Sequence, residues 1–182
     1  NWDGEYIKYG ECLAAPRNAT SFYNPKLFIR RTDDRILAVY DEEKIIGLNS
    51  IHCLQATSNK ISLKFLLCIL NSKLINWYFQ FQNFHMVGKP LAEVKVVFIE
   101  RLPIILTEDQ LPFTSRADLM LLLCKKLLDI SQKFQRMLQR KFDLEELPGK
   151  LQSWYLLSYK EFIAELGKKK VKLTLAQEAE WE

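Results

Sequence analysis

A long amphipathic run in the second half of the chain constrains the fold most. Six apolar residues follow one another at steps of three and four: Met120, Leu123, Leu127, Ile130, Phe134 and Met137. This spacing places them on one face of an α-helix, as an a/d seam of nearly three heptads. The polar face carries mostly basic residues, namely Lys125, Lys126, Lys133, Arg136, Arg140 and Lys141. We predict a helix over residues 115–142 that packs on its own domain, on another domain or in a coiled coil.

The ends of this helix have recognisable signals. Ser115 with Asp118 three residues later is typical of a capping box. Pro148 and Gly149 break the helical pattern. Further on, Ser158 and Gly167 bound a second helix over residues 159–166, and Thr174 could cap a third.

The first half of the chain has a different pattern. Short apolar and β-branched runs predict strands over residues 26–32, 35–40 and 45–55, separated by charged turns. Apolar residues at helical spacing predict a helix over residues 62–82, and a β-branched run predicts a strand over residues 91–99. The fold class is therefore α+β, with a small β-sheet lobe and a packed helix over residues 1–114, then a long helix and helical tail over 115–182.

Composition bounds the class of protein. With 182 residues, 48% of them hydrophobic, the chain can bury a sizeable core. It has no run of 18 uncharged apolar residues, so we expect no membrane-spanning segment and a cytoplasmic location. Because the chain begins at Asn1 and ends within a helical pattern, we interpret it as a piece of a longer protein. The four cysteines lack metal-ligand spacing, and we expect reduced, buried thiols.

Catalytic motifs are scarce. The sequence contains no Gly-rich phosphate loop and no nucleophile elbow. We expect His52, on a strand, to be a core residue bonded to backbone. Asp34, Glu42 and Lys44 have the residue types of a metal-dependent nuclease, but they fall at predicted turns, where exposed charge is the simpler interpretation. We therefore predict no catalytic, cofactor-binding or metal-ligating residue in this chain.

Basic residues are the better candidates for function. The net charge is only +4, yet residues 8–35 hold six basic against three acidic residues, and residues 60–101 hold six against two. Arginine and lysine on loops suit phosphate contacts and bidentate readout of guanine. Arg30 and Arg31 are adjacent in one strand, so we expect them to point to opposite faces. The predicted DNA-binding residues are Arg17, Lys26, Arg30, Arg31, Arg35, Lys60 and Lys89.

Three segments in order resemble a known family. They are NPKLFIRRTDDRILAVYDEEKIIGLNSIHCLQ (24–55), LKFLLCILNSKLINWYF (63–79) and GKPLAEVKVVFIERLPI (88–104). Together they resemble the TaqI-like C-terminal specificity domain of type IIG restriction-modification enzymes and N6-adenine DNA methyltransferases. The resemblance covers roughly residues 1–105, and residues 154–182 look like the C-terminal region of the same large enzymes.

The resemblance implies a role in sequence-specific recognition of double-stranded DNA, beside a methyltransferase domain of the same chain. It also implies S-adenosylmethionine for the parent enzyme, and Mg²⁺ where the parent also carries a nuclease. The methyltransferase signature Asn-Pro-Pro-Tyr/Phe is absent, because Lys26 follows Asn24-Pro25. We expect a non-catalytic fragment, whose helix over 115–142 serves as spacer and dock.

Two alternatives remain open at this point. The chain could be a protein-interaction module that docks on other domains through the 115–142 helix. It could instead be a stand-alone nuclease that uses Asp34, Glu42 and Lys44.

Overall fold

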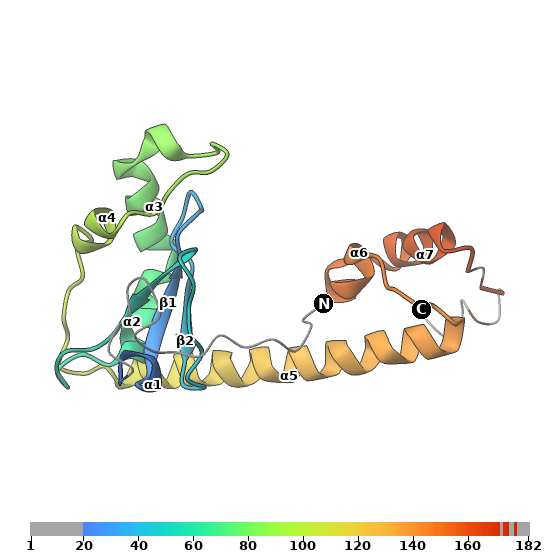
Figure 1. Ribbon diagram of the computed structural model, residues 1–182, viewed down its shortest axis with the longest axis horizontal. Helices are drawn as coiled ribbons and strands as arrows, with labels where there is room; N and C mark the ends of the chain where they lie inside the picture. Colours follow the sequence, from blue (N-terminus) through green and yellow to red (C-terminus); the bar gives the residue numbers. More distant parts are fainter. Residues whose placement is uncertain (1–19, 172, 175–176, 178–182) are drawn as a thin grey trace, which may run out of the picture. The chain divides into compact units, whose positions relative to one another are not determined.

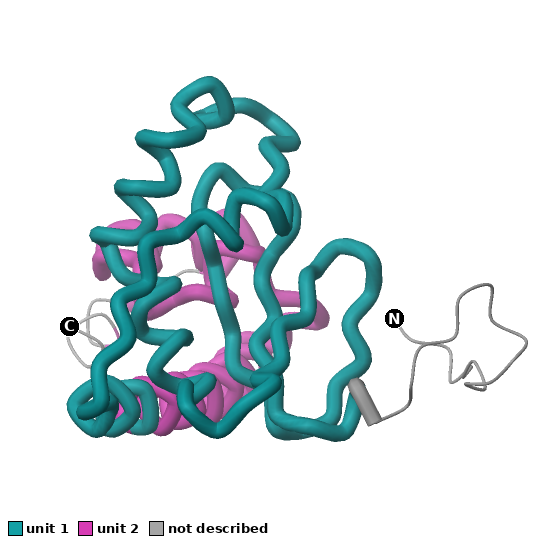
Figure 2. The backbone as a smooth tube through the Cα atoms, turned by 90° about the vertical axis from the view of Figure 1, so that its left-hand side faces the viewer, with its two compact units in different colours: residues 1–118 teal, residues 119–182 magenta. Residues whose placement is uncertain are grey.

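The computed structural model describes residues 20–171, 173–174 and 177. The chain forms two compact units, unit 1 up to Asp118 and unit 2 from Leu119 (Figure 1, Figure 2). Sequence reasoning placed the boundary at 114/115. The described elements are α1 (Thr20–Tyr23), β1 (Lys26–Arg30), β2 (Ala38–Asp41), β3 (Ile51–Leu54), α2 (Leu63–Leu70), α3 (Lys73–Gln82), η1 (Phe84–Met86), α4 (Val96–Glu100), α5 (Leu111–Phe142), α6 (Gly149–Gln152), η2 (Trp154–Leu156) and α7 (Tyr159–Lys168). The α+β prediction is confirmed.

Unit 1 is built on a three-stranded antiparallel sheet in the order β2-β1-β3. β1 is central, with Ile29 opposite Ala38 on one side and His52 on the other. Leu27 and Ile29 are fully buried, as the two-residue period of a strand requires for its core face. The three strands lie where the sequence predicted them, although the third, β3, covers only four of the eleven residues expected.

Two helices stand where one was predicted. α2 lies against the sheet and ends at Asn71, and Ser72 caps the start of α3 by accepting the amide of Ile75 at 3.1 Å (Figure 1). Their buried side chains complete the core of unit 1, namely Phe65, Leu67, Leu70, Ile75 and Phe79. The uninterrupted apolar periodicity concealed the break, which two polar capping residues produce.

The strand predicted over residues 91–99 is wrong. Glu93 forms only an isolated bridge with Thr32, and residues 96–100 form the short helix α4. The reason is tertiary, because β2 and β3 already occupy both edges of β1. The segment instead pairs with the backbone beyond the end of β1, where the amide of Val94 donates to the carbonyl of Arg31 at 2.8 Å.

The long helix exists as α5 but begins four residues earlier than predicted. Asp109 accepts the amide of Leu111 at 3.1 Å, whereas Ser115 lies inside the helix and donates its hydroxyl to the carbonyl of Leu111. The predicted cap at Ser115 is therefore wrong. At the other end, Asp143 adopts a positive φ of 50° and the amide of Leu144 donates to the carbonyl of Gln139 at 2.9 Å, as in a Schellman motif.

Unit 2 packs α6 and α7 on the C-terminal part of α5. Its core consists of Leu138, Leu147, Leu151, Phe162 and Leu166. Ser158 caps α7 in a reciprocal capping box with Glu161, and the helix runs through Gly167 to Lys168 rather than ending at 166. Thr174 exchanges hydrogen bonds with Gln177, but most of the helix predicted after Thr174 lies outside the described residues.

Cys53, Cys68 and Cys124, the cysteines within the described ranges, form no disulfide, and their burial differs from expectation. Cys53 and Cys124 are exposed, while Cys68 is partly buried, and this burial raises the pKa of its thiol. Cys12 lies outside the described residues. No helix in the described part of the chain is both long and apolar enough to cross a membrane.

Candidate nucleic-acid interface

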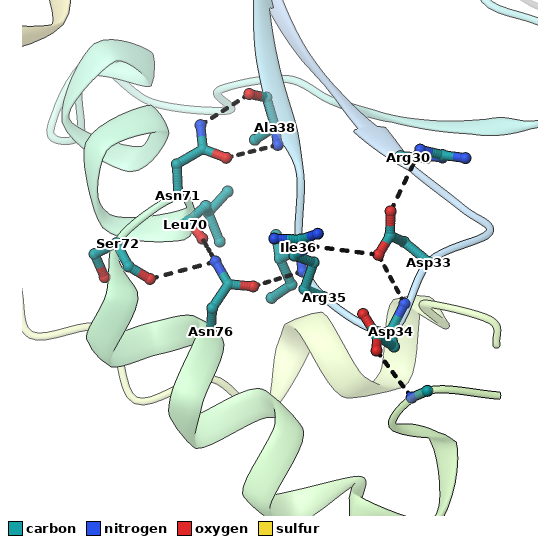
Figure 3. A network of polar contacts seen from close by, with 11 residues as sticks. Arg30, Asp33, Asp34, Arg35, Ile36, Ala38, Leu70, Asn71, Ser72 and Asn76 are labelled. Carbon is teal, nitrogen blue, oxygen red and sulfur yellow. Dashed lines mark hydrogen bonds and ion pairs between the residues drawn. The ribbon is translucent and has the colours of Figure 1, made fainter. Parts of the chain in front are cut away.

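The turn between β1 and β2 presents two arginines (Figure 3). Asp33 lies between them, with its carboxylate oxygens 3.4 Å from Nη1 of Arg30 and 3.7 Å from Nε of Arg35. Both arginine side chains are 61% exposed, whereas Asp33 is 15% exposed and also accepts the amide of Asp34 at 2.9 Å. Asp33 thus shapes the turn and loosely holds two guanidinium groups that face solvent.

A second segment meets this turn. Asp34 accepts the amide of Gly88 at 2.9 Å, and Gly88 has a φ of +70°, in the left-handed region that favours glycine. Lys89 follows Gly88 and is exposed. Arg30, Arg35 and Lys89 therefore lie at one end of unit 1, although Lys89 is more than fifty residues from the two arginines in the sequence. We call these three residues the basic end.

Two asparagine side chains bond to the backbone that leads from the basic end into β2 (Figure 3). Asn76 of α3 accepts the amide of Ile36 at 2.7 Å. Asn71 accepts the amide of Ala38 at 2.9 Å and donates to its carbonyl at 2.8 Å. The two side chains thus pair the amide of Ile36 and both backbone groups of Ala38 at the start of β2, which would otherwise lack partners at this edge. They tie the arginine-bearing turn to the helices.

Apolar side chains stand beside the basic end. Phe84, Val87 and Leu91, on the segment that carries Lys89, are 79%, 45% and 86% exposed. Exposed apolar residues next to cations suit contacts with thymine methyl groups or with a widened base step. Sequence reasoning missed them. The available signal was a set of large apolar residues around the loop residues Gly88 and Pro90, where a core cannot receive them.

Arg31 differs from its neighbour in its partners. Its Nε and Nη2 both lie 2.7 Å from Oε1 of Glu93, and its Nη1 donates to the carbonyl of Asn49 at 3.3 Å. The hydrogen bond from Arg31 lowers the pKa of Glu93. Arg31 thus links three segments of unit 1, and its donors are largely occupied.

Lys26 was predicted to contact DNA, and its position in the structure argues against that role. Its side chain is fully buried, with Nζ 2.5 Å from Asp41 and donating to the carbonyl of Phe22 at 2.8 Å. Because a buried ammonium cannot reach a phosphate, we exclude Lys26 from the candidate interface and assign it to the core.

The remaining predicted residues lie elsewhere. Lys60 is exposed, and its carbonyl accepts a hydrogen bond from the side chain of Gln110. Lys64, four residues further along the chain, lies over the ring of Tyr40 in β2. This is the end of β2 opposite the β1–β2 turn, so Lys60 is separate from the basic end. Arg17 lies outside the described residues.

The structure does not assemble the candidate nuclease residues. Asp34 precedes β2, while Glu42 and Lys44 follow it, so the strand separates them. Within the described ranges, no group of three His, Cys, Asp or Glu residues could hold a metal ion. His52 bonds to backbone as expected, with Nε2 2.7 Å from the carbonyl of Val94, but it is partly buried rather than a core residue.

Exposed basic residues at one end of a small antiparallel sheet suit contacts with nucleic acid. Residues 1–104, more than half of the chain, match the TaqI-like C-terminal specificity domain, and the chain belongs to this family. Residues 106–182 match a domain of unknown function (DUF8810). No curated protein and no solved structure matches the chain. The family supports a DNA-recognition role in restriction-modification enzymes.

Proposed function

We propose that the chain reads the DNA target of a restriction-modification enzyme and performs no chemistry itself. The observation that carries the proposal is the basic end, because Arg30, Arg35 and Lys89 converge on one exposed surface of a specificity-family domain. Arg31 pairs instead with Glu93 and with the carbonyl of Asn49, and so links segments of unit 1.

Arg30 and Arg35 are placed so that each can exchange Asp33 for a group on DNA. The ion pairs from Arg30 and Arg35 to Asp33 are long, and both guanidinium groups are exposed, so each pair contributes little to stability. Either guanidinium can therefore leave Asp33 for a phosphate or for the O6 and N7 atoms of guanine. Lys89 is suited to a phosphate, which fixes register without reading sequence.

The proposal extends to the other domains of the parent enzyme. We infer an adjoining methyltransferase domain that transfers a methyl group to the N6 atom of adenine, fused in type IIG fashion to an endonuclease. S-adenosylmethionine, and Mg²⁺ for cleavage, would be held by those other domains. The duplex would be bound in the cytoplasm.

Selection from a random duplex library tests the proposal. The 182-residue chain is incubated with the library, bound duplexes are sequenced, and the enriched motif is compared with that of the variant Arg30→Gln/Arg35→Gln. We expect a defined motif whose guanine positions relax in the variant, because each bidentate guanine contact contributes about 1–3 kcal/mol of discrimination. Lys89→Gln should weaken binding to all sequences alike. It should also lower by about 1 the slope of the logarithm of the binding constant against the logarithm of the salt concentration.

The matched control removes two cations from the opposite end of unit 1. Lys44→Gln/Lys60→Gln should leave the enriched motif intact. If the motif changes with this control and not with the Arg30 and Arg35 substitutions, the DNA sequence is read at the opposite end of unit 1, and the proposal for the basic end is contradicted.

A second function is supported by one further observation on α5. Met120, Leu123, Leu127 and Ile130 are 41–59% exposed and recur at steps of three and four, in a seam whose next member, Phe134, packs against the core of unit 2. We infer that this stripe docks the methyltransferase domain of the parent enzyme.

Co-purification with the separately expressed methyltransferase domain tests the docking role. Leu123→Gln/Leu127→Gln should abolish co-purification, while Leu128→Gln, which removes an equally exposed leucine on another side of α5, should not. Retention of the complex by the double variant would exclude the stripe as the dock.

A further inference from the structure

One side of α5 in unit 2 is strongly basic. Lys126, Lys133, Arg136 and Arg140 are exposed, and we call them the basic face. Over its whole length α5 carries seven basic and two acidic residues, a net charge of +5. The DNA-recognition role assigned to unit 1 makes no use of this charge.

The basic face points away from the packed core of unit 2. Successive residues of a helix are about 100° apart, so residues two positions apart differ by about 200°. Lys133 lies two positions after the buried Ser131, and Arg136 and Arg140 lie two positions on either side of the buried Leu138. The cations are therefore opposite the side that contacts α6 and α7.

The cations are available for a ligand. Lys133 pairs with Asp129 at 2.8 Å, an exposed contact within one helix that contributes little. Arg136 and Arg140 form no ion pair with another described residue. Lys133, Arg136 and Arg140, together with Lys141 and Met137, line one surface hollow of about 480 Å³.

We propose that the basic face binds the sugar-phosphate backbone of duplex DNA, as a second, sequence-independent contact of the protein. The occupant follows from charge complementarity along a line, because Lys126, Lys133 and Arg140 repeat every seven residues and span about 21 Å. A line of cations of that length matches consecutive phosphates of a duplex better than a single small anion. The proposal extends the proposed function of unit 1 and assumes the same duplex.

Salt-dependent binding of the whole chain to a labelled duplex tests this contact. The variant Lys126→Gln/Lys133→Gln/Arg136→Gln/Arg140→Gln is compared with a control that removes four exposed cations from the α6 and α7 region of unit 2, namely Lys150→Gln/Lys160→Gln/Lys169→Gln/Lys170→Gln. Dissociation constants are measured between 50 and 300 mM KCl, roughly the range over which counterion release is resolved. Circular dichroism checks that each variant keeps its helix content.

We expect the basic-face variant to lower the salt slope by about 3 and to weaken binding on the order of 100-fold at 100 mM KCl, because each phosphate contact contributes about 0.9 to the slope. The control should change the slope by less than about 1. A variant that keeps charge, Lys126→Arg/Lys133→Arg/Arg136→Lys/Arg140→Lys, should bind like the wild type.

Two outcomes separate this proposal from the function of unit 1. If the basic-face variant and the control lose equal affinity, the contact is overturned, whatever motif unit 1 selects. If the slope falls as expected but no motif is enriched from random duplexes, the phosphate contact stands and the recognition role of unit 1 fails.

Discussion

Replacing Lys26 by methionine separates a structural role from DNA binding. Methionine keeps the length of the side chain but leaves the carboxylate of Asp41, only 3% exposed, without its cation. Breaking a buried pair from one side costs about 3–5 kcal/mol. We expect the lower end, about 3 kcal/mol, since Asp41 still accepts the amides of Glu43 and Ile45 at 3.2 Å each.

Hydrogen exchange of the β1 amides measures this loss within unit 1, because core amides exchange through global opening of their unit. Adding Asp41→Asn to Lys26→Met removes the unpaired charge and should recover most of the loss. Duplex affinity, measured where the variant is folded, should stay within about twofold of wild type, since the ammonium never reaches the surface. A loss below about 1 kcal/mol, or a large drop in duplex affinity with normal β1 protection, would refute the reasoning.

Three further perturbations test the local structure. Asn71→Ala should destabilise unit 1 by about 1–3 kcal/mol in urea denaturation, because it leaves both backbone groups of the buried Ala38 without partners; an unchanged midpoint would contradict this. Gly88→Ala should cost about 1–2 kcal/mol through its left-handed backbone, with no steric clash, and should weaken duplex binding through the adjoining lysine. The capping bonds from Ser158 lower the pKa of Glu161 below 4.5, so this stabilisation is present above that pH and is lost as the pH falls through the folded value; Ser158→Ala should remove about 1 kcal/mol and this pH dependence together, as measured by urea midpoints at pH 7 and pH 4.

The sequence predicted the elements whose periodicity is local. The seam from Met120 to Met137 indicated α5, and the turn signals at Asp33 and Asp34 separated β1 from β2. Where pairing partners decide the structure, local pattern failed. Both edges of β1 are paired with β2 and β3, and the β-branched run from Val94 to Ile99 forms the short helix α4 after an isolated bridge at Glu93.

The site could be predicted only in part for a similar reason. Charge type, with loop position for Arg35 and Lys89, identified Arg30, Arg35 and Lys89, but not their proximity, which depends on the hydrogen bond that the amide of Gly88 donates to Asp34. The same criteria also selected Lys26, because nothing in the local sequence reveals that Asp41 will receive its ammonium in the core.

Methylation mapping of the parent enzyme after exchange of residues 1–104 tests whether unit 1 reads the DNA target. The chimera carries the corresponding lobe of a relative with a different target, and the genome of a host that expresses it is sequenced for N6-methyladenine. We expect the methylated sequence to switch to the target of the donor, while exchange of residues 119–182 should leave the target unchanged. A chimera that methylates the original sequence with full activity would contradict the assignment of DNA reading to unit 1.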